Sequence, residues 1–326
     1  MKLSDVGERA LIKIARDVCK QGGGVRVGIG DDAAVIEVGG KYIVATTDML
    51  VAGSHFPPGT TPKQMGKKAV VVNLSDLAAM GAEPLGLIFS VALPRRLDVK
   101  FVRQLVQGMD ETARKYGTYV VGGDLDESDE ITIVGAAFGT THKRKLLKRS
   151  GAKEGDLVTV TGTFGAASAG LKLLQKKLPA KGYQTLVDTI LEPSARLKEG
   201  NLLARSGAVT SAIDVTDGLA ANLWQLAEES RVKITVDRGK IPAHPLAKKF
   251  AVQHDFDVDD FVLFGGEDFE LLFTVTPKDW RKVQHALERV GTTPTVIGRV
   301  SGGKGVFIRD KEKIRMLPNR GYEHFR

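Results

Sequence analysis

The segment GIGDDAAV, residues 28–35, follows a strand-like stretch over 25–28 and decides the kind of fold to expect. Its pattern G-x-G-x-x-A is typical of dinucleotide-binding folds, in which the backbone approaches a pyrophosphate. Asp31 and Asp32 would repel that pyrophosphate unless a metal ion bridged the carboxylates and the phosphate. The P-loop pattern G-x-x-x-x-G-K-[ST] is absent from the chain. The segment therefore indicates a nucleotide site that depends on a metal ion.

Four further motifs place an aspartate beside glycine, serine or threonine. They are Thr46-Thr47-Asp48, Asn73-Leu74-Ser75-Asp76, Gly122-Gly123-Asp124 and Asp214-Val215-Thr216-Asp217-Gly218. We expect each motif at the beginning or end of a helix or strand, where loops on a rigid scaffold carry functional groups. One such aspartate alone is more often an N-cap or a turn residue than a ligand. The recurrence of the motif favours a shared role.

A shared role for these aspartates requires a cation. Carboxylates within a few ångströms of each other repel, and the pKa of one of them rises unless a positive charge lies between them. Oxygen ligands without cysteine suit a hard cation such as Mg²⁺. Magnesium keeps several waters and takes its remaining ligands from substrate phosphates. The sequence thus predicts magnesium together with a nucleotide.

Strand-like and helical segments alternate along the chain. Helices are expected over 8–20, 62–82, 98–116, 166–175, 219–229 and 279–290, and strands over 25–28, 42–46, 119–121, 131–138, 157–161, 212–215, 269–275, 296–300 and 305–309. The pattern over 62–82 is helical, although Gly66 and the β-branched run Val70-Val71-Val72 have weak helix propensity. The alternation predicts an α/β or α+β fold with two domains.

The boundary between the two expected domains lies where the charge changes. Residues 1–140 hold 16 Lys and Arg against 17 Asp and Glu, which leaves 31 against 22 for the rest of the chain. We therefore expect domains over 1–145 and 146–326. The run 142–153 has six basic residues and no acidic one. It is typical of a solvated surface, because a nucleic-acid groove would add stacking aromatic residues.

Other features predict a cytoplasmic protein. No apolar run approaches the roughly 18 residues that a membrane span needs, and the first 20 residues carry charges throughout, unlike a signal peptide. Cys19 is the single cysteine, so the chain cannot form an internal disulfide or a thiolate metal cluster. We expect neither a membrane nor a nucleic acid as a partner.

The order of the motifs carries a resemblance. The motifs are GIGDDAAV (28–35), TTDMLVAGSHF (46–56), NLSDLAAMGAEP (73–84), GGDL (122–125), RSGAKEGD (149–156), DVTDGL (214–219) and GGEDFELLF (265–273). This ordered set resembles the thiamine-monophosphate kinase family, which belongs to the ATP-binding superfamily of aminoimidazole ribonucleotide synthetase. The resemblance implies an N-terminal α/β domain whose sheet forms a homodimer, and a C-terminal α+β domain.

The resemblance also implies roles for individual residues. Magnesium ligands are expected at Asp32, Thr46, Thr47, Asp48, Asp76, Asp124, Asp214 and Asp217. Contacts with ATP are expected at Tyr116, Gly123, Arg149 and Thr216. Contacts with thiamine monophosphate are expected at His55, Glu267 and Tyr322. No residue is expected to act as a covalent nucleophile or a general base.

The expected reaction is direct transfer of the γ-phosphoryl group of ATP to thiamine monophosphate, which gives thiamine diphosphate. The acceptor is a phosphate monoester with a second pKa of about 6, so its attacking oxygen is already ionised near neutral pH. A general base is then unnecessary. The barrier is the repulsion between two anionic phosphates, which metal ions relieve.

The sequence leaves three alternatives open. A sister enzyme of the superfamily, similar to aminoimidazole ribonucleotide synthetase or to the hydrogenase-maturation protein, would use ATP to activate another small substrate. Selenophosphate synthetase is disfavoured, because Cys19 falls in a predicted helix and not in a glycine-rich loop. A regulatory protein that binds a nucleotide without catalysis would show a gap in the aspartate set. A nucleic-acid binder would show steeply salt-dependent affinity.

Overall fold

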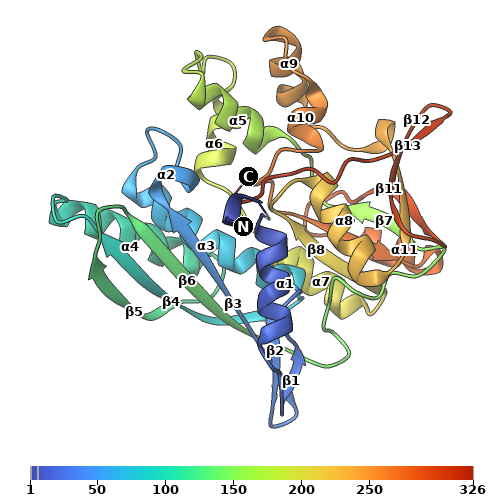
Figure 1. The fold of residues 1–326 in the computed structure, drawn as a ribbon, viewed down its shortest axis with the longest axis horizontal. Coiled ribbons are helices and arrows are strands. Elements are labelled where there is room, and N and C mark those ends of the chain that lie inside the picture. The colour runs from blue at the N-terminus through green and yellow to red at the C-terminus, as the bar shows by residue number, and fades with distance from the viewer. Residues whose placement is uncertain (1, 6, 326) are drawn as a thin grey trace.

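The computed structural model describes residues 2–5 and 7–325, which form two sheets that lie side by side (Figure 1). The first half of the chain supplies a six-stranded sheet in the order β1-β2-β3-β6-β4-β5. Its strands are β1 (Val25–Val27), β2 (Ala34–Val38), β3 (Lys41–Val51), β4 (Glu83–Leu93), β5 (Val120–Glu127) and β6 (Thr132–Thr141). All neighbours are antiparallel except β4 and β5.

The second half supplies a seven-stranded sheet in the order β13-β12-β9-β11-β7-β10-β8. Its strands are β7 (Leu157–Val160), β8 (Val209–Val215), β9 (Lys233–Asp237), β10 (Glu270–Val275), β11 (Thr295–Ser301), β12 (Gly305–Asp310) and β13 (Lys313–Met316). Only β9 and β12 run parallel within this sheet of the described chain. The two sheets with their helices confirm the expected α/β (α+β) class. The expected boundary between residues 145 and 146 falls between β6 and β7 and stays a prediction.

Helices cover the six-stranded sheet on one face and the seven-stranded sheet on both. The helices are α1 (Glu8–Val18), α2 (Ala52–His55), α3 (Pro62–Ala79), α4 (Val99–Lys115), α5 (Ala166–Gln175), α6 (Gln184–Leu191), α7 (Leu197–Ser206), α8 (Leu219–Ser230), α9 (Pro245–Gln253), α10 (Val258–Val262) and α11 (Trp280–Glu288). Short 3₁₀ turns lie at Leu3–Asp5, Arg238–Lys240 and Pro277–Asp279. None of the helices in the described ranges is long and apolar enough to cross a membrane. The cytoplasmic location stays a prediction.

The strands of the two sheets differ in their pattern of apolar residues because they differ in burial. In β10, Leu272 packs in the same core as Leu223 of α8, while Phe273 packs in the same core as Leu203 of α7. Every residue of β10 is buried, and the strand is almost continuously apolar. In β6, buried residues alternate with half-buried ones, because only one face of the sheet is covered.

Helix α3 confirms the helix expected over 62–82 and is unbroken from Pro62 to Ala79, despite Gly66 and the valine run. Thr61 and Gln64 form a capping box at its start. The run Val70-Val71-Val72 is buried, and tertiary packing outweighs the weak helix propensity of valine. Gly66 does not interrupt the helix. It allows α4 to pack closely, because a Cβ at this position would overlap the carbonyl oxygen of Leu105 in α4. Helix α3 contacts β6 on one side and β8 on the other, and thereby joins the two halves.

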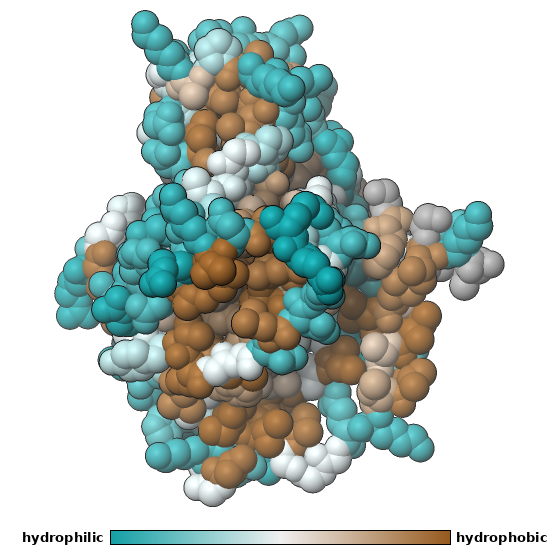
Figure 2. Space-filling model, turned by 90° about the vertical axis from the view of Figure 1, so that its left-hand side faces the viewer, coloured by the Kyte–Doolittle hydropathy of each residue, from teal (hydrophilic) through white to brown (hydrophobic). Residues whose placement is uncertain are grey.

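The uncovered face of the six-stranded sheet carries exposed apolar side chains. Met49 is 57% exposed and Val121 is 64% exposed, and Ile88 lies in the adjacent strand β4. Apolar side chains gather on this side of the molecule (Figure 2). A contiguous apolar surface of this kind is typical of an interaction site.

Several expected positions differ from those observed. Asp48 lies inside β3, Asp76 inside α3 and Asp124 inside β5, so these motifs do not end their elements as expected. Strand β4 was not expected, and it contains Pro84 and Gly86, two residues that strands disfavour. The ladder tolerates both residues, since the pairing of β4 with β6 shifts its register between them.

Candidate active site

A cavity of about 690 Å³ opens between the two halves of the chain. One group of lining residues is acidic or carries hydroxyls, and includes Thr47, Asp48, Asp76, Thr216 and Asp217. A second group is mostly aromatic or apolar and has one acidic residue, Glu267. It includes Leu50, His55, Val72, Leu171, Ile190, Glu267, Phe269, Tyr322 and His324. Both groups draw residues from both halves, so only the folded chain assembles them.

Three aspartates cluster beside the acidic group. Asp32 follows β1, Asp76 lies in α3 and Asp214 lies in β8. One carboxylate oxygen of each residue lies within 4.8 Å of the other two. Ser75 donates its hydroxyl to Asp214 Oδ2 at 2.5 Å, and Thr46 donates its hydroxyl to Asp76. Asp32 and Asp214, 182 residues apart in the sequence, therefore meet at one point of the fold.

The members of this cluster raise the pKa of one another. Burial raises the pKa of Asp76 well above its ordinary value, and the charges of Asp48, Asp214 and Asp32 raise it further. Burial, followed by the charge of Asp32, raises the pKa of Asp214 to about 8. Burial, followed by the charge of Asp217, raises the pKa of Asp48 to about 6. A cation among these carboxylates would remove the repulsion.

Arg149 neutralises only part of the acidic cluster. Its Nε and Nη2 donate to Asp32 Oδ1 at 2.9 and 2.6 Å, and its backbone N–H donates to Asp31 Oδ1 at 3.1 Å. Asp32 Oδ2 is buried without a hydrogen-bond partner in the part of the chain that the structure describes. A buried oxygen without a partner is costly, and a hard cation takes such an oxygen as a ligand. The donor set therefore fits a metal ion.

Strand β3 directs two threonines to opposite faces of the sheet next to Asp48. Thr46 lies on the buried face and donates its hydroxyl to Asp76. Thr47 donates its hydroxyl to the carbonyl oxygen of Gly135 in β6 at 2.8 Å. Thr46 thus touches a carboxylate of the cluster and Thr47 lines the cavity, and the expected role of both as metal ligands stays a prediction.

The loop between β8 and α8 connects the two groups of lining residues. The carbonyl of Thr216 accepts the N–H of Glu267, and the carbonyl of Asp217 accepts the N–H of Tyr322, both at 2.8 Å. Burial raises the pKa of Asp217, and the charge of Glu8 raises it further. The loop that carries the acidic side chains therefore also fixes the backbone of two residues in the second group.

His55, Glu267 and Tyr322 come together in the cavity as expected. His55 Nδ1 lies 3.0 Å from the Val51 N–H and 3.3 Å from the Val51 carbonyl oxygen. The Val51 N–H can only donate, so Nδ1 accepts from it, which places the ring proton on Nε2. Burial lowers the pKa of His55, and the charge of Lys68 lowers it further.

Three expected site residues lie away from the cavity. Asp48 and Gly123 share one row across β3, β6, β4 and β5, so they are three strand spacings, or about 14 Å, apart. Asp124 is the next residue and points to the uncovered face. The Tyr116 hydroxyl accepts the N–H of Ala195 at 2.8 Å, and Tyr116 lines a separate recess. The expected roles of Gly123, Asp124 and Tyr116 stay predictions.

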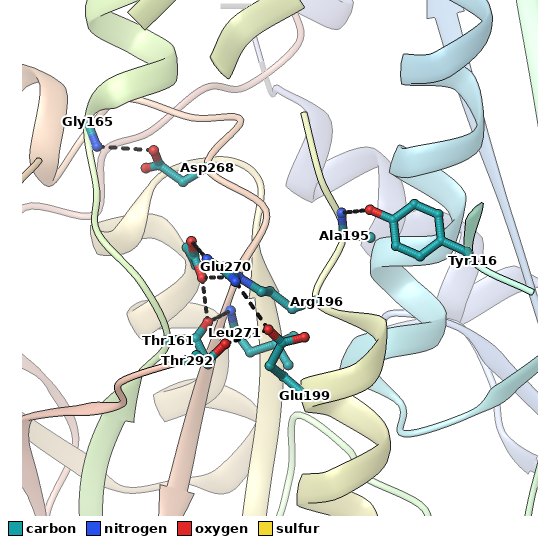
Figure 3. A network of polar contacts seen from close by, with 10 residues as sticks. All are labelled: Tyr116, Thr161, Gly165, Ala195, Arg196, Glu199, Asp268, Glu270, Leu271 and Thr292. Carbon is teal, nitrogen blue, oxygen red and sulfur yellow. Dashed lines mark hydrogen bonds and ion pairs between the residues drawn. The ribbon is translucent and has the colours of Figure 1, made fainter. Parts of the chain in front are cut away.

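A buried polar network holds the start of β10, directly after the turn that carries Glu267 (Figure 3). Arg196 Nε and Nη2 donate to the Glu270 carboxylate at 2.7 and 2.6 Å, and Thr161 donates its hydroxyl at 2.6 Å. Arg196 Nη1 also donates to Glu199 at 3.1 Å. Arginine and carboxylate pair well through two parallel bonds. The network fixes β10 against α7 and so anchors one wall of the cavity.

Comparison with known proteins gives one consistent family. Residues 30–141 match the family model of the AIR synthase related protein N-terminal domain, and residues 153–311 match that of the C-terminal domain. The thiamine-monophosphate kinase of Pyrococcus horikoshii is 38% identical over 300 residues, which cover 91% of each chain. The chain belongs to the thiamine-monophosphate kinase family.

Two further members of the thiamine-monophosphate kinase family match over nearly their full length. The enzyme of Aquifex aeolicus is 34% identical over 327 residues and covers all of both chains. The solved structure of AaThiL complexed with AMPPCP and TMP is 33% identical, has a TM-score of 0.89 and covers 99% of each chain. The expected family and its fold are therefore confirmed.

Two further residues of this thiamine-monophosphate kinase family member were not expected from the sequence: His324 lines the cavity, and Lys68 lies behind its wall, bonded to the lining residue Glu267. Lys68 does carry a signal, because Lys68, Val72 and Asp76 are spaced by four residues and share one face of α3. His324 carries none. Its N–H donates to Glu8 at 3.2 Å, so contact with the distant helix α1 places it at the cavity.

Proposed function

We propose that the protein transfers the γ-phosphoryl group of ATP to thiamine monophosphate and releases ADP and thiamine diphosphate. One observation carries the proposal: a single cavity joins an acidic group of residues to a group with a histidine and apolar side chains. The acidic group suits metal-bound phosphates, and Leu171, Ile190 and Phe269 suit the organic part of the acceptor. The relative AaThiL, complexed with AMPPCP and TMP, supports both ligands.

We infer that Mg²⁺ occupies the acidic cluster. Its donor set contains only carboxylate and hydroxyl oxygens, and Asp32 Oδ2 is buried with no other partner among the described residues. The residues that would hold it are Asp32, Asp76 and Asp214, with Thr46, Thr47, Asp48 and Asp217 beside them. When bound, the ion would neutralise the phosphates and the carboxylates together.

The side chains bind and orient the two phosphate compounds, and none of them removes a proton. The acceptor phosphate has a second pKa of about 6 and is ionised near pH 7. Arg149 presents a planar fork suited to phosphate, and we assign it to ATP together with Thr216. His55 offers its Nε2–H to the acceptor, with Glu267 and Tyr322 beside it. This arrangement accounts for the reaction without a covalent intermediate.

We propose further that two copies of the chain pair through the uncovered face of the six-stranded sheet. Met49, Ile88 and Val121 are exposed there, and Asp124 points to the same face. Light scattering after gel filtration is expected to give twice the chain mass of 35.1 kDa. Ile88→Asp is expected to give single chains, because it places a charge in an apolar contact. A wild-type protein that runs as a single chain would contradict the dimer.

The activity is tested directly with purified protein, ATP, Mg²⁺ and thiamine monophosphate. We expect ADP and thiamine diphosphate in equal amounts, measured by chromatography. Thiamine without its phosphate is the control for the acceptor, and EDTA is the control for the metal. Formation of ADP without thiamine diphosphate would point to another acceptor, and absence of both products would refute the kinase activity.

A further inference from the structure

Lys68 is a buried lysine that none of the expected roles uses. It lies in α3 and is 2% exposed, on the helix face that also carries Asp76. A buried ammonium group persists only where it is paired and hydrogen-bonded, because its desolvation is costly. Its surroundings therefore show what the residue does.

Three acceptors surround the Lys68 ammonium group. Nζ donates to Glu267 Oε1 at 2.6 Å, to Glu267 Oε2 at 2.7 Å and to the His55 carbonyl oxygen at 2.7 Å. A lysine has three N–H donors, so none remains for a ligand. Lys68 can act on a bound molecule only through the residues that it holds.

The two residues held by Lys68 come from opposite halves of the chain and line one cavity. His55 ends α2, and Glu267 lies in the turn before β10. This turn is strained, since Glu267 has a φ of 67° and Phe269 a φ of 51°. Backbone bonds fix its main chain, because Glu267 N–H donates to Thr216 and Phe269 N–H donates to Val215. The Glu267 side chain is fixed by Lys68.

We propose that Lys68 is a positioning residue for the phosphoryl acceptor, acting by aiming the Glu267 carboxylate and holding the His55 turn. The inference rests on the proposed function. Glu267 keeps 28% of its side chain exposed, towards the cavity, while Lys68 fixes its other side. Without Lys68 the carboxylate would rotate freely and the His55 carbonyl would lose a charged donor. Lys68 therefore sets the affinity for the acceptor and leaves the affinity for ATP unchanged.

The test compares Lys68→Met with Lys63→Met. Lys63 lies on the same helix and pairs with Glu111 at 2.7 Å, and both side chains are more than a third exposed. Loss of hydrogen bonds to a charged group predicts a KM for thiamine monophosphate that is about 10- to 100-fold higher in Lys68→Met. The KM for ATP is expected to stay within about 2-fold, because no contact of Lys68 involves the acidic cluster. Lys63→Met is expected to match the wild type.

A double variant keeps the proposal testable if Lys68→Met folds poorly. Lys68→Met with Glu267→Gln removes both charges, so no unpaired ion remains buried. If Lys68 acts largely through Glu267, the double variant raises the KM for the acceptor by less than the product of the rises in the two single variants. Additive effects, or an unchanged acceptor KM in Lys68→Met, would overturn the inference. An equal rise of both KM values would indicate a general structural role and would also overturn it.

The proposed function and this inference fail in distinguishable ways. A wild-type protein that makes no thiamine diphosphate refutes the function, whatever the variants do. If the wild-type protein is active and the Lys68→Met variant has a normal KM for the acceptor, only the role of Lys68 is refuted.

Discussion

Asp76→Asn is expected to lower kcat by about 1,000-fold or more, which corresponds to roughly 4 kcal/mol of transition-state stabilisation. Asp76 belongs to the cluster with Asp32 and Asp214, and its buried carboxylate is exposed to the charges of Asp48, Asp214 and Asp32. An amide is a weaker ligand for a hard cation than a carboxylate, and the variant therefore loses metal affinity. The same change removes one of several mutually repelling charges, so it should stabilise the metal-free protein.

The two opposite effects make Asp76→Asn a sharp test. Titration calorimetry with Mg²⁺ and an ATP analogue measures the loss of binding, and thermal unfolding in EDTA measures the gain in stability. Asp110→Asn is the control, since Asp110 is an exposed-surface aspartate in α4 that pairs only with Arg114 among the described residues. Full activity of Asp76→Asn, with unchanged Mg²⁺ binding, would show that the cluster is not the metal site.

The metal-free protein is expected to lose stability as the pH rises from about 4 to about 8. The pKa of Asp48 is raised from 3.8 to about 6, that of Asp31 to about 7 and that of Asp214 to about 8. Over this range the folded state holds protons that the unfolded state has released. The free energy of unfolding therefore falls with pH, until the highest of these pKa values is passed. We expect the Tm in EDTA to fall by at least about 5 °C between pH 5 and pH 8.

Magnesium should reverse this trend. An ion that binds only the folded, ionised cluster stabilises it by mass action, and its ligands must be deprotonated. Thermal unfolding at pH 5 and pH 8, with and without Mg²⁺, measures the effect. The variant Asp214→Asn should flatten the dependence in EDTA. A metal-free protein whose Tm rises over this range would contradict the raised pKa values.

The chemistry of the site could be predicted from the sequence because it depends on residue types. The recurring aspartate motifs contain no cysteine, so they predict oxygen ligands wherever the fold places each motif. Asp32, Asp76 and Asp214 do meet in the folded protein, within 4.8 Å of one another. The ordered motifs likewise predicted the family, since motif order is a property of the sequence itself.

The outcome for α3 shows where local patterns fail. Gly66 and the run Val70-Val71-Val72 disfavour a helix in isolation, yet the helix is continuous. The reason lies in the tertiary structure, since the valines are buried and Gly66 allows α4 to approach. Packing energy from distant segments is not encoded in the local propensity of a residue.

The sequence by itself determined the family, the class of fold and the acidic chemistry of the site. Only the tertiary structure decided which residues share the cavity. It separates Gly123 from Asp48 by three strands of one sheet, and it brings Lys68 to Glu267 across 199 residues of chain. Strand register and the packing of two halves set these distances, and both depend on contacts between segments that are remote in the sequence.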